Sequence, residues 1–420
     1  MLKKLYIHNF KSFWNSRFEF GKLNCLIAPN NSGKSNLIEV IEFCDKLLFP
    51  RENDEEKINF SQLKNFRHNE ENITFELEFE LEQRVLVYHD LFDYKYNVKF
   101  NIVLGTVNNI DLEVDGYIKH IVVLGKDNKN ISSQTFGTRL YDNELENDIE
   151  NYDKYNEEIQ AKRYTKFNLK YSQNTLNYEL NCPSTIKESI AILFGFQLNA
   201  KNDLTKPIKF KNIFSKKIFV SYDFQPYLIK SQTISSFQLN KIGTNLVEFI
   251  AGQLDDTIED ISTSLIGEVE QVNSIKVDKD SAHKTLYFVE EGGYEVPLKN
   301  TSDGTVHFLA IMSALISNES NTIAMMFEEP ERHMHMKVLS YLLNSMRDNK
   351  AQVFFTTHST EMLSELKLDE IIFMFRDYNG DTKGIRAKDI VNIDKLMKIY
   401  KKDLVEMIKI GILDDLEDEL

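Results

Sequence analysis

A glycine, a lysine and a serine stand together where an apolar run gives way to an amphipathic one. Leu23–Ile27 is an alternating apolar run, and the segment that starts at Asn36 repeats apolar residues at helical spacing. Gly33-Lys34-Ser35 is therefore predicted on a tight loop from a strand into a helix, where backbone N–H groups and the positive helix end point at one place. Such a place suits a phosphate: Lys34 would add a positive charge, and Ser35 a hydroxyl ligand for Mg²⁺.

The predicted binding residues of this loop are Asn30, Asn31, Ser32, Gly33, Lys34, Ser35 and Asn36. The pattern G-x-x-x-x-G-K-[ST] has Ala28 in place of its first glycine. Alanine carries a Cβ and resists positive φ, so the loop must adopt a conformation that alanine tolerates. Taken alone, the same three residues could form a turn that binds nothing.

Two apolar segments in the second half of the chain end in polar residues. Thr322–Phe327 runs into Glu328-Glu329, and Ala351–Thr357 runs into His358. Because α/β sheets bind ligands at the carboxyl ends of their strands, we expect His358 to lie beside Glu329. The two acids indicate one carboxylate that holds Mg²⁺ through water and a neighbour that faces the attacking water.

A third polar turn precedes a predicted helix over Val306–Ile316. Ser302 and Gly304 lie at or near its N-cap, and a helix N-terminus can bind an anion. On its own, a cap of this kind is common and favours a purely structural interpretation.

The motifs occur in a fixed order along the chain: Asn-Asn-Ser-Gly-Lys-Ser-Asn, Ser-Asp-Gly-Thr, Glu-Glu-Pro-Glu with His335 four residues further on, and Thr-Thr-His-Ser. This set resembles the ABC-type ATPase heads of the SMC/RecF/OLD group, and in particular the compact prokaryotic AAA15/AAA21-type ATPases. The resemblance covers roughly residues 1–85 and 240–400, and no motif covers the middle.

The resemblance implies ATP and Mg²⁺ as cofactors. Lys34, Glu329 and His358 become the catalytic residues, with Glu329 as the base and His358 as the switch histidine. Ser35 and Glu328 become the metal-site residues. Glu328 replaces the more usual aspartate, and a small shift or a water should absorb the extra methylene.

The resemblance also implies a homodimer that sandwiches two ATP molecules. Ser302 and Gly304 belong to the signature segment, which in such heads reaches the γ-phosphate bound to the opposite protomer. Gln62 is a candidate glutamine-loop residue, although its spacing is loose.

The predicted fold class is α/β. We expect a P-loop NTPase head of the ABC type with a mixed central sheet and helices, an antiparallel β subdomain, an inserted α/β middle region and no long coiled coil. The predicted domains are residues 1–85 and 241–420 for the two parts of the head, and 86–240 for the middle region.

Several elements can be placed within this outline. Alternation predicts a half-buried strand over Ile73–Leu81, and strands at Asn97–Leu104, Asp111–Val114 and Lys119–Leu124 suggest an antiparallel meander. Apolar residues at three- and four-residue steps predict one long helix over Gly243–Val272.

The formal net charge of −15 excludes a uniformly basic nucleic-acid clamp. A lysine-rich patch over Lys201–Lys217, interleaved with phenylalanines, could touch DNA, but a solvated connector explains it equally well. The three cysteines lack metal-ligand or disulfide-framework spacing, and no transmembrane run or signal segment is visible. We therefore expect a cytoplasmic protein.

Three functions agree with these observations. The first is an ATPase that controls a separate effector, because the chain resembles the ATPase subunits of phage-defence systems such as Septu and PARIS. OLD-type relatives carry a nuclease module after the head. Only about sixty residues follow His358, too few for that module, so we expect any nuclease activity in a separate partner. The second is a slowly hydrolysing, nucleotide-gated scaffold or sensor. The third is a RecF-like DNA-repair ATPase, which the lysine patch would support.

Overall fold

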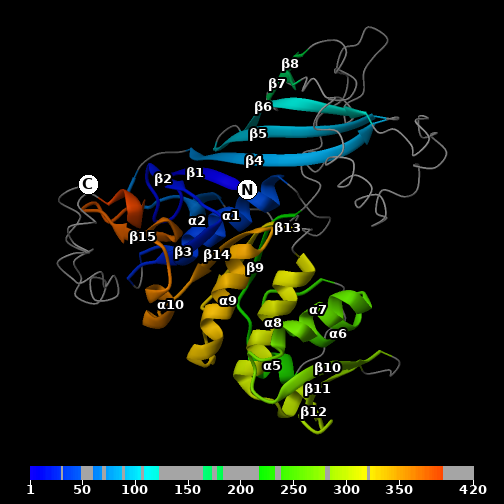
Figure 1. Ribbon diagram of the computed structural model, residues 1–420. Coiled ribbons are helices and arrows are strands. Elements are labelled where there is room, and N and C mark those ends of the chain that lie inside the picture. The colour runs from blue at the N-terminus through cyan, green and yellow to red at the C-terminus, as the bar shows by residue number, and fades with distance from the viewer. Residues whose placement is uncertain are drawn as a thin grey trace. The chain divides into compact units, whose positions relative to one another are not determined.

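The computed structural model describes the following parts of the 420-residue chain: residues 1–29, 32–48, 60–68, 72–87, 90–105, 108–122, 164–172, 177–182, 217–231, 238–279, 284–318 and 322–390 (Figure 1). The chain forms two compact units. The first combines Met1–Thr74 with Phe214–Leu420, and the second is Phe75–Ile213.

A six-stranded sheet is the centre of the first unit. Its strand order is β16-β15-β3-β14-β13-β9, and all neighbours are parallel except the edge strand β16. The strands are β3 (Leu23–Ile27), β9 (Lys217–Tyr222), β13 (Thr322–Glu328), β14 (Gln352–Thr356), β15 (Ile371–Arg376) and β16 (Thr382–Arg386). β9 comes from the segment that sequence analysis assigned to the middle region, yet it pairs with β13.

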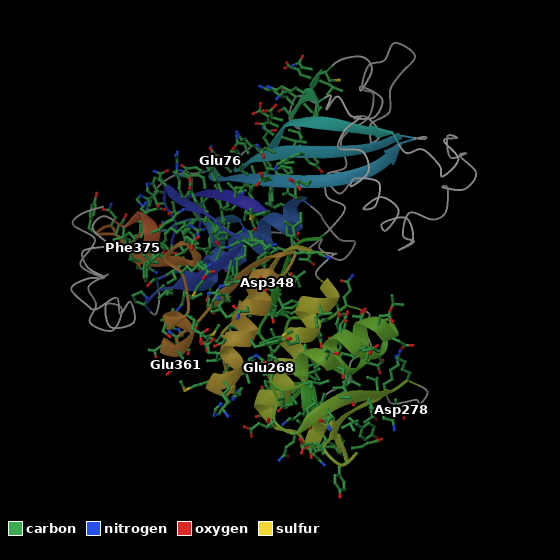
Figure 2. All side chains as sticks on the ribbon, in the orientation of Figure 1. Glu76, Glu268, Asp278, Asp348, Glu361 and Phe375 are labelled. Carbon is green, nitrogen blue, oxygen red and sulfur yellow. The ribbon has the colours of Figure 1, made fainter. Side chains whose placement is uncertain are left out.

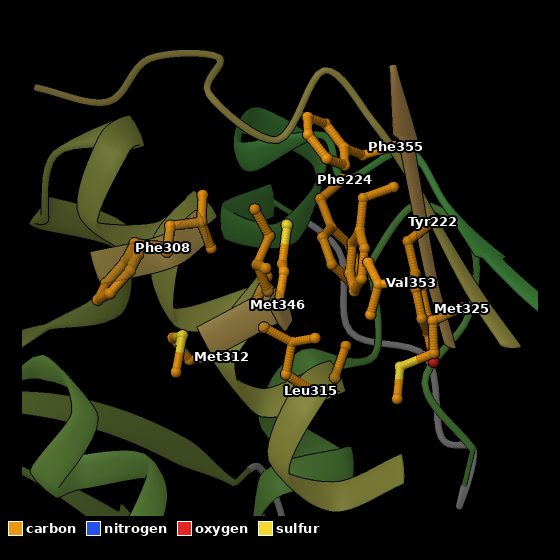
Figure 3. Packing of buried hydrophobic residues seen from close by; sticks show 14 of the residues in the cluster. Tyr222, Phe224, Phe308, Met312, Leu315, Met325, Met346, Val353 and Phe355 are labelled. Atoms are coloured by element: carbon orange, nitrogen blue, oxygen red, sulfur yellow. The ribbon is translucent and has the colours of Figure 1, made fainter. Parts of the chain in front are cut away.

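Alternate residues of these strands face a core formed with helices α8 (Asp303–Asn318) and α9 (Met336–Asp348). Met325 and Phe327 of β13 belong to this core together with Val353 and Phe355 of β14, as period-two alternation requires. Figure 3 shows side chains of α8 and α9 packed against these strand residues. Phe354, between the two β14 residues, points the other way and meets Phe20 with ring centroids 5.0 Å apart.

Smaller elements complete the first unit. They are the antiparallel pair β1 (Leu2–His8) and β2 (Ser16–Glu19), helices α1 (Lys34–Leu48), α2 (Phe60–Leu63), α5 (Pro226–Ser231) and α10 (Thr360–Ser364), and the antiparallel sheet β10 (Val272–Asp278), β11 (Thr285–Glu290), β12 (Glu295–Pro297). Short 3₁₀ turns lie at Leu298–Asn300, Leu368–Glu370 and Ala387–Asp389.

The prediction of one helix over Gly243–Val272 is wrong. The segment forms α6 (Leu246–Ala251), α7 (Asp255–Leu265) and the start of β10. Gly252 ends α6, and Leu254 has an extended backbone (φ −64°, ψ 152°) and is 78% exposed. The apolar spacing therefore continues across residues that are not helical. Asp255 and Asp256 begin α7, where carboxylates interact favourably with the positive helix end.

The second unit contains the predicted antiparallel meander. Its strands follow one another in the order β4 (Ile73–Val87), β5 (Asp90–Leu104), β6 (Asn109–Val122), β7 (Tyr164–Ser172) and β8 (Asn177–Asn181). β6 joins two of the predicted strands into one, because its pairing with β5 continues unbroken through Gly116. Apart from Lys217, the lysine patch lies outside the described residues.

Figure 2 shows the side chains of both units, with exposed acids such as Asp348 and Glu361 on the first. Among the described residues, the longest helix is α8 with 16 residues, and none is long and apolar enough to cross a bilayer.

Candidate active site

The loop between β3 and α1 turns tightly into the helix. The Ser32 backbone N–H and hydroxyl both donate to the Pro29 carbonyl, at 3.3 and 2.8 Å. Gly33 follows with φ +98°, a conformation that favours glycine, and α1 begins at Lys34. Ala28 is not among the residues with positive φ, so its Cβ is tolerated. Asn30 and Asn31 lie outside the described residues.

Lys34 folds back over its own loop. Its Nζ donates to the Ala28 carbonyl oxygen at 3.0 Å and lies 3.1 Å from Nε2 of His358. Burial lowers the pKa of Lys34, and the nearby Glu329 carboxylate opposes that shift. Among the described residues, the hydrogen-bond partners of this half-buried ammonium are a carbonyl oxygen and an imidazole ring, so Lys34 gains a stronger partner when a phosphate enters the loop.

Glu328 and Ser35 supply oxygen donors of the type that Mg²⁺ prefers. Ser35 is exposed in the first turn of α1, and Glu328 ends β13. Burial raises the pKa of Glu328, and Lys241 opposes that shift with its Nζ 3.7 Å from Oε1. No group of three or more acidic, histidine or cysteine side chains suited to a metal exists among the described residues. One hydroxyl and one carboxylate fit an ion such as Mg²⁺, which commonly takes its remaining ligands from a substrate phosphate and water.

Glu329 has an unusual backbone for a non-glycine residue. Its φ is +44°, and its N–H is bonded to both the carbonyl and the hydroxyl oxygen of Thr356, each at 3.1 Å. Oε2 accepts two N–H bonds from Arg332, at 3.2 and 3.0 Å, while Oε1 lies 4.0 Å from Nε2 of His358. A strained backbone held by neighbours is typical of functional sites.

The ends of β13 and β14 lie side by side, which confirms that His358 lies beside Glu329. Glu331, which sequence analysis named only as part of a motif, connects them. Its Oε1 accepts from the Thr357 hydroxyl at 2.6 Å and from the His358 N–H at 3.1 Å. Its Oε2 is buried and has no hydrogen-bond partner among the described residues. A third acid after an apolar strand was the only sequence signal for this contact.

Ser302 caps α8 in the usual way. Its Oγ accepts the Thr305 N–H at 3.1 Å and lies 2.8 Å from the Thr305 hydroxyl. Gly304 serves packing inside its own unit, because a Cβ there would lie 2.3 Å from the His333 carbonyl oxygen. In the described part of the chain, no hydrogen bond or ion pair joins Ser302 or Gly304 to Lys34.

His307 is a further link that the sequence did not reveal. It is 1% exposed on α8, and its Nδ1 lies 2.6 Å from the Arg332 carbonyl oxygen. Burial lowers the pKa of His307 to about 4. The neutral ring therefore donates from Nδ1 and ties α8 to the turn that follows Glu329.

Two predicted binding residues have other surroundings. Asn36 donates its side-chain Nδ2–H to Ser12 Oγ at 2.8 Å, so it contributes to the support of the loop. Gln62 lies on α2 with an exposed side chain.

Comparisons with known proteins identify the family of the chain. A family described as AAA ATPase domain (AAA_15) matches residues 1–363. A protein of Helicobacter pylori named ATP/GTP phosphatase is 25% identical over 397 residues, 91% of each chain.

Two solved structures are also similar, each with 13% identity. They are an SMC head domain from Thermotoga maritima (TM-score 0.40; 92% of this chain, 98% of that one) and an SMC head bound to the C-terminal winged-helix domain of ScpA (0.46; 91% and 97%). The match over residues 1–363 shows an ATPase, and the chain belongs to the AAA_15 family of AAA ATPase domains.

Proposed function

We propose that ATP binds with its phosphates in the loop around Gly33 and Lys34 and is hydrolysed at the adjoining strand ends. The observation that carries this proposal is the convergence of three residues from separate segments. Lys34 Nζ lies 3.1 Å from His358 Nε2, and the same His358 nitrogen lies 4.0 Å from Glu329 Oε1. Lys34 exchanges the Ala28 carbonyl and the His358 ring for phosphate oxygens, and the carboxylate of Glu329 accepts a proton from the attacking water.

Magnesium would be held by Ser35 and Glu328 together with phosphate oxygens, where it would neutralise charge that develops during phosphoryl transfer. His358 contributes its ring between the phosphate lysine and the base. The backbone N–H of His358 donates to Glu331, so the position of the His358 ring depends on the turn that carries Glu329 and Glu331.

The finer proposal is a composite site in a head-to-head homodimer. Ser302 is exposed, caps a 16-residue helix and has no hydrogen bond or ion pair with Lys34 among the described residues. When the Thr305 hydroxyl donates to Ser302 Oγ, the Ser302 proton and the positive end of α8 can meet a phosphate that a second protomer presents.

Control of a separate effector, in prokaryotic antiviral defence, is proposed from the resemblance of the motifs alone.

The alternative is a RecF-like role in which the protein binds DNA. Its test is the affinity for duplex DNA, measured at increasing salt concentration. A steep loss of affinity would indicate phosphate contacts, whereas no binding at low salt would argue for the effector role.

Two substitutions test the composite site. Lys34→Ala should abolish ATP binding, because the phosphates lose the side-chain cation of the loop. Ser302→Arg should leave binding by the monomer nearly intact but abolish hydrolysis and ATP-induced dimerisation, because a bulky cation blocks close approach. Ser302→Asp is the matched control: aspartate preserves the N-cap, so the melting temperature should be unchanged while hydrolysis is lost.

Mixing Lys34→Ala with Ser302→Arg sharpens the test. A heterodimer contains one intact site, with Lys34 from one protomer and Ser302 from its partner, so ATPase activity should partly return. Tight ATP binding by Lys34→Ala would reject the loop assignment, and full activity of Ser302→Arg alone would reject the composite site.

A further inference from the structure

Thr382 lies at the start of β16, beyond the residues that the family model matches. It is wholly buried, and its backbone N–H donates to the Ser12 carbonyl at 2.7 Å. Its hydroxyl lies 2.8 Å from Ser12 Oγ and 2.9 Å from the carbonyl oxygen of Ser32. A residue some 350 positions away in sequence thus contacts the phosphate loop directly.

The hydrogen bonds around Thr382 have one consistent direction. The Asn36 amide nitrogen can only donate, so Ser12 Oγ accepts from it at 2.8 Å. The Ser32 carbonyl can only accept, so it takes the Thr382 proton. Each hydroxyl has a single proton, and the Ser12 proton therefore goes to Thr382 Oγ1. The result is a chain from Asn36 through Ser12 and Thr382 to Ser32, with every hydroxyl donating once and accepting once.

This chain determines which way the loop's peptide group faces. A trans peptide is planar, with C=O and N–H on opposite sides. When the Ser32 carbonyl points to Thr382, the N–H of Gly33 must point the opposite way, away from Thr382. Gly33 is suited to this turn, since its φ is +98° and a Cβ would lie 2.6 Å from Thr382 Oγ1 and 2.8 Å from Ser12 Oγ.

We propose that Thr382 is a positioning residue of the ATP site, which holds the Ser32–Gly33 peptide with its N–H turned toward the phosphates. The proposal rests on the assignment of this loop as the phosphate site. Preorganised donors strengthen binding because no energy is spent to orient them when the ligand arrives. Loss of the Thr382 hydroxyl should therefore weaken ATP binding and raise KM, while kcat at saturating ATP changes less.

The experiment compares Thr382→Val, which keeps the shape but lacks the hydroxyl, with Thr382→Ser, which keeps the hydroxyl. ATP affinity is measured by calorimetry in the presence of Mg²⁺, well below the melting temperature of each variant. Thr382→Val should bind ATP ~10-fold more weakly, about 1.4 kcal/mol, because a buried carbonyl and a buried hydroxyl each lose a partner. Thr382→Ser should stay within about threefold of the wild type.

Thr322→Val is the matched control. Thr322 is a buried threonine at the opposite, amino end of β13, and its hydroxyl has no hydrogen-bond partner among the described residues. The same substitution there should leave ATP affinity unchanged. Comparison of the two valine variants separates an effect on the loop from the general cost of replacing a buried threonine.

Lys34→Ala separates this inference from the assignment on which it rests. If Lys34→Ala binds ATP normally, the loop assignment fails. If Lys34→Ala loses binding but Thr382→Val binds within twofold of the wild type, only the role of Thr382 fails. Equal loss in Thr382→Val and Thr382→Ser would also reject it, since the hydroxyl would then not matter. Should Thr382→Val not fold, Thr382→Ala removes the same hydroxyl with a smaller side chain, and affinity within twofold of the wild type there would overturn the proposal.

Discussion

His307 should make the stability of the ATPase fall as the solution becomes mildly acidic. The side chain is 1% exposed, packs near Phe224 with ring centroids 6.4 Å apart, and donates to the Arg332 carbonyl. Burial in these surroundings lowers the pKa of His307 to about 4, against an ordinary value of 6.5. Protonation would place a charge among apolar side chains.

The sign follows from the pKa of His307 in the two states. Because the folded pKa is lower, the unfolded chain binds the proton more readily, and protonation favours unfolding. The contribution of the neutral ring is fully present above pH 6.5 and is lost as the pH falls toward 4. The full difference is roughly 3 kcal/mol, and about 2 kcal/mol of it should disappear between pH 7 and pH 5.

Urea unfolding of the wild type and of His307→Asn, at pH 7, 6 and 5, measures this effect. Asparagine keeps an N–H for the Arg332 carbonyl but does not titrate. The variant should be less stable at pH 7, because the smaller side chain packs less well, and its stability should depend less on pH. The wild type should lose about 2 kcal/mol more than the variant between pH 7 and pH 5. Equal losses in the two proteins would refute the assignment of this pH dependence to His307.

Three further variants test other parts of the site. Glu329→Gln should retain ATP and slow steady-state hydrolysis by ~10²-fold or more, and unchanged turnover would exclude Glu329 as the base. Gly304→Ala should destabilise the protein by about 1–3 kcal/mol in urea unfolding, whereas Gly252→Ala, whose Cβ would meet nothing closer than 3.5 Å, should cost little; similar effects would contradict the close approach. Glu331→Ala should lower kcat about tenfold with little change in KM, because the His358 loop loses its anchor, and a change in KM alone would argue for a role in binding.

The candidate residues of the site could be proposed from the sequence because their signals are local. A strand that runs into a Gly-Lys-Ser turn and a helix, or into two acids, is encoded within about fifteen consecutive residues by apolar spacing and turn chemistry. The parallel pairing of β13 and β14 followed from the same reasoning, since both are short apolar strands with polar residues at their carboxyl ends.

The supports of the site could not be predicted, because they depend on which distant segments become neighbours. In the sequence, nothing marks Thr382 as a residue of the site. Only the fold brings β16, and with it Thr382, against Ser12 and Ser32. From the sequence, Gly304 is predicted only as a residue near a helix cap. In the structure it also allows the backbone at His333 to lie close to α8.

The break between α6 and α7 is a second feature that the sequence did not predict. Apolar periodicity continues through Gly252 and Leu254, but the chain leaves the helix there and α7 begins as a separate helix. Apolar periodicity indicates which face of a helix is buried, but it does not indicate the residue at which the helix ends. That end depends on how the whole unit packs. Thus the sequence by itself determined the chemistry and its order along the chain, whereas the tertiary structure decided which buried hydroxyls and carbonyls hold that chemistry in place, since only close packing brings such groups within hydrogen-bond distance.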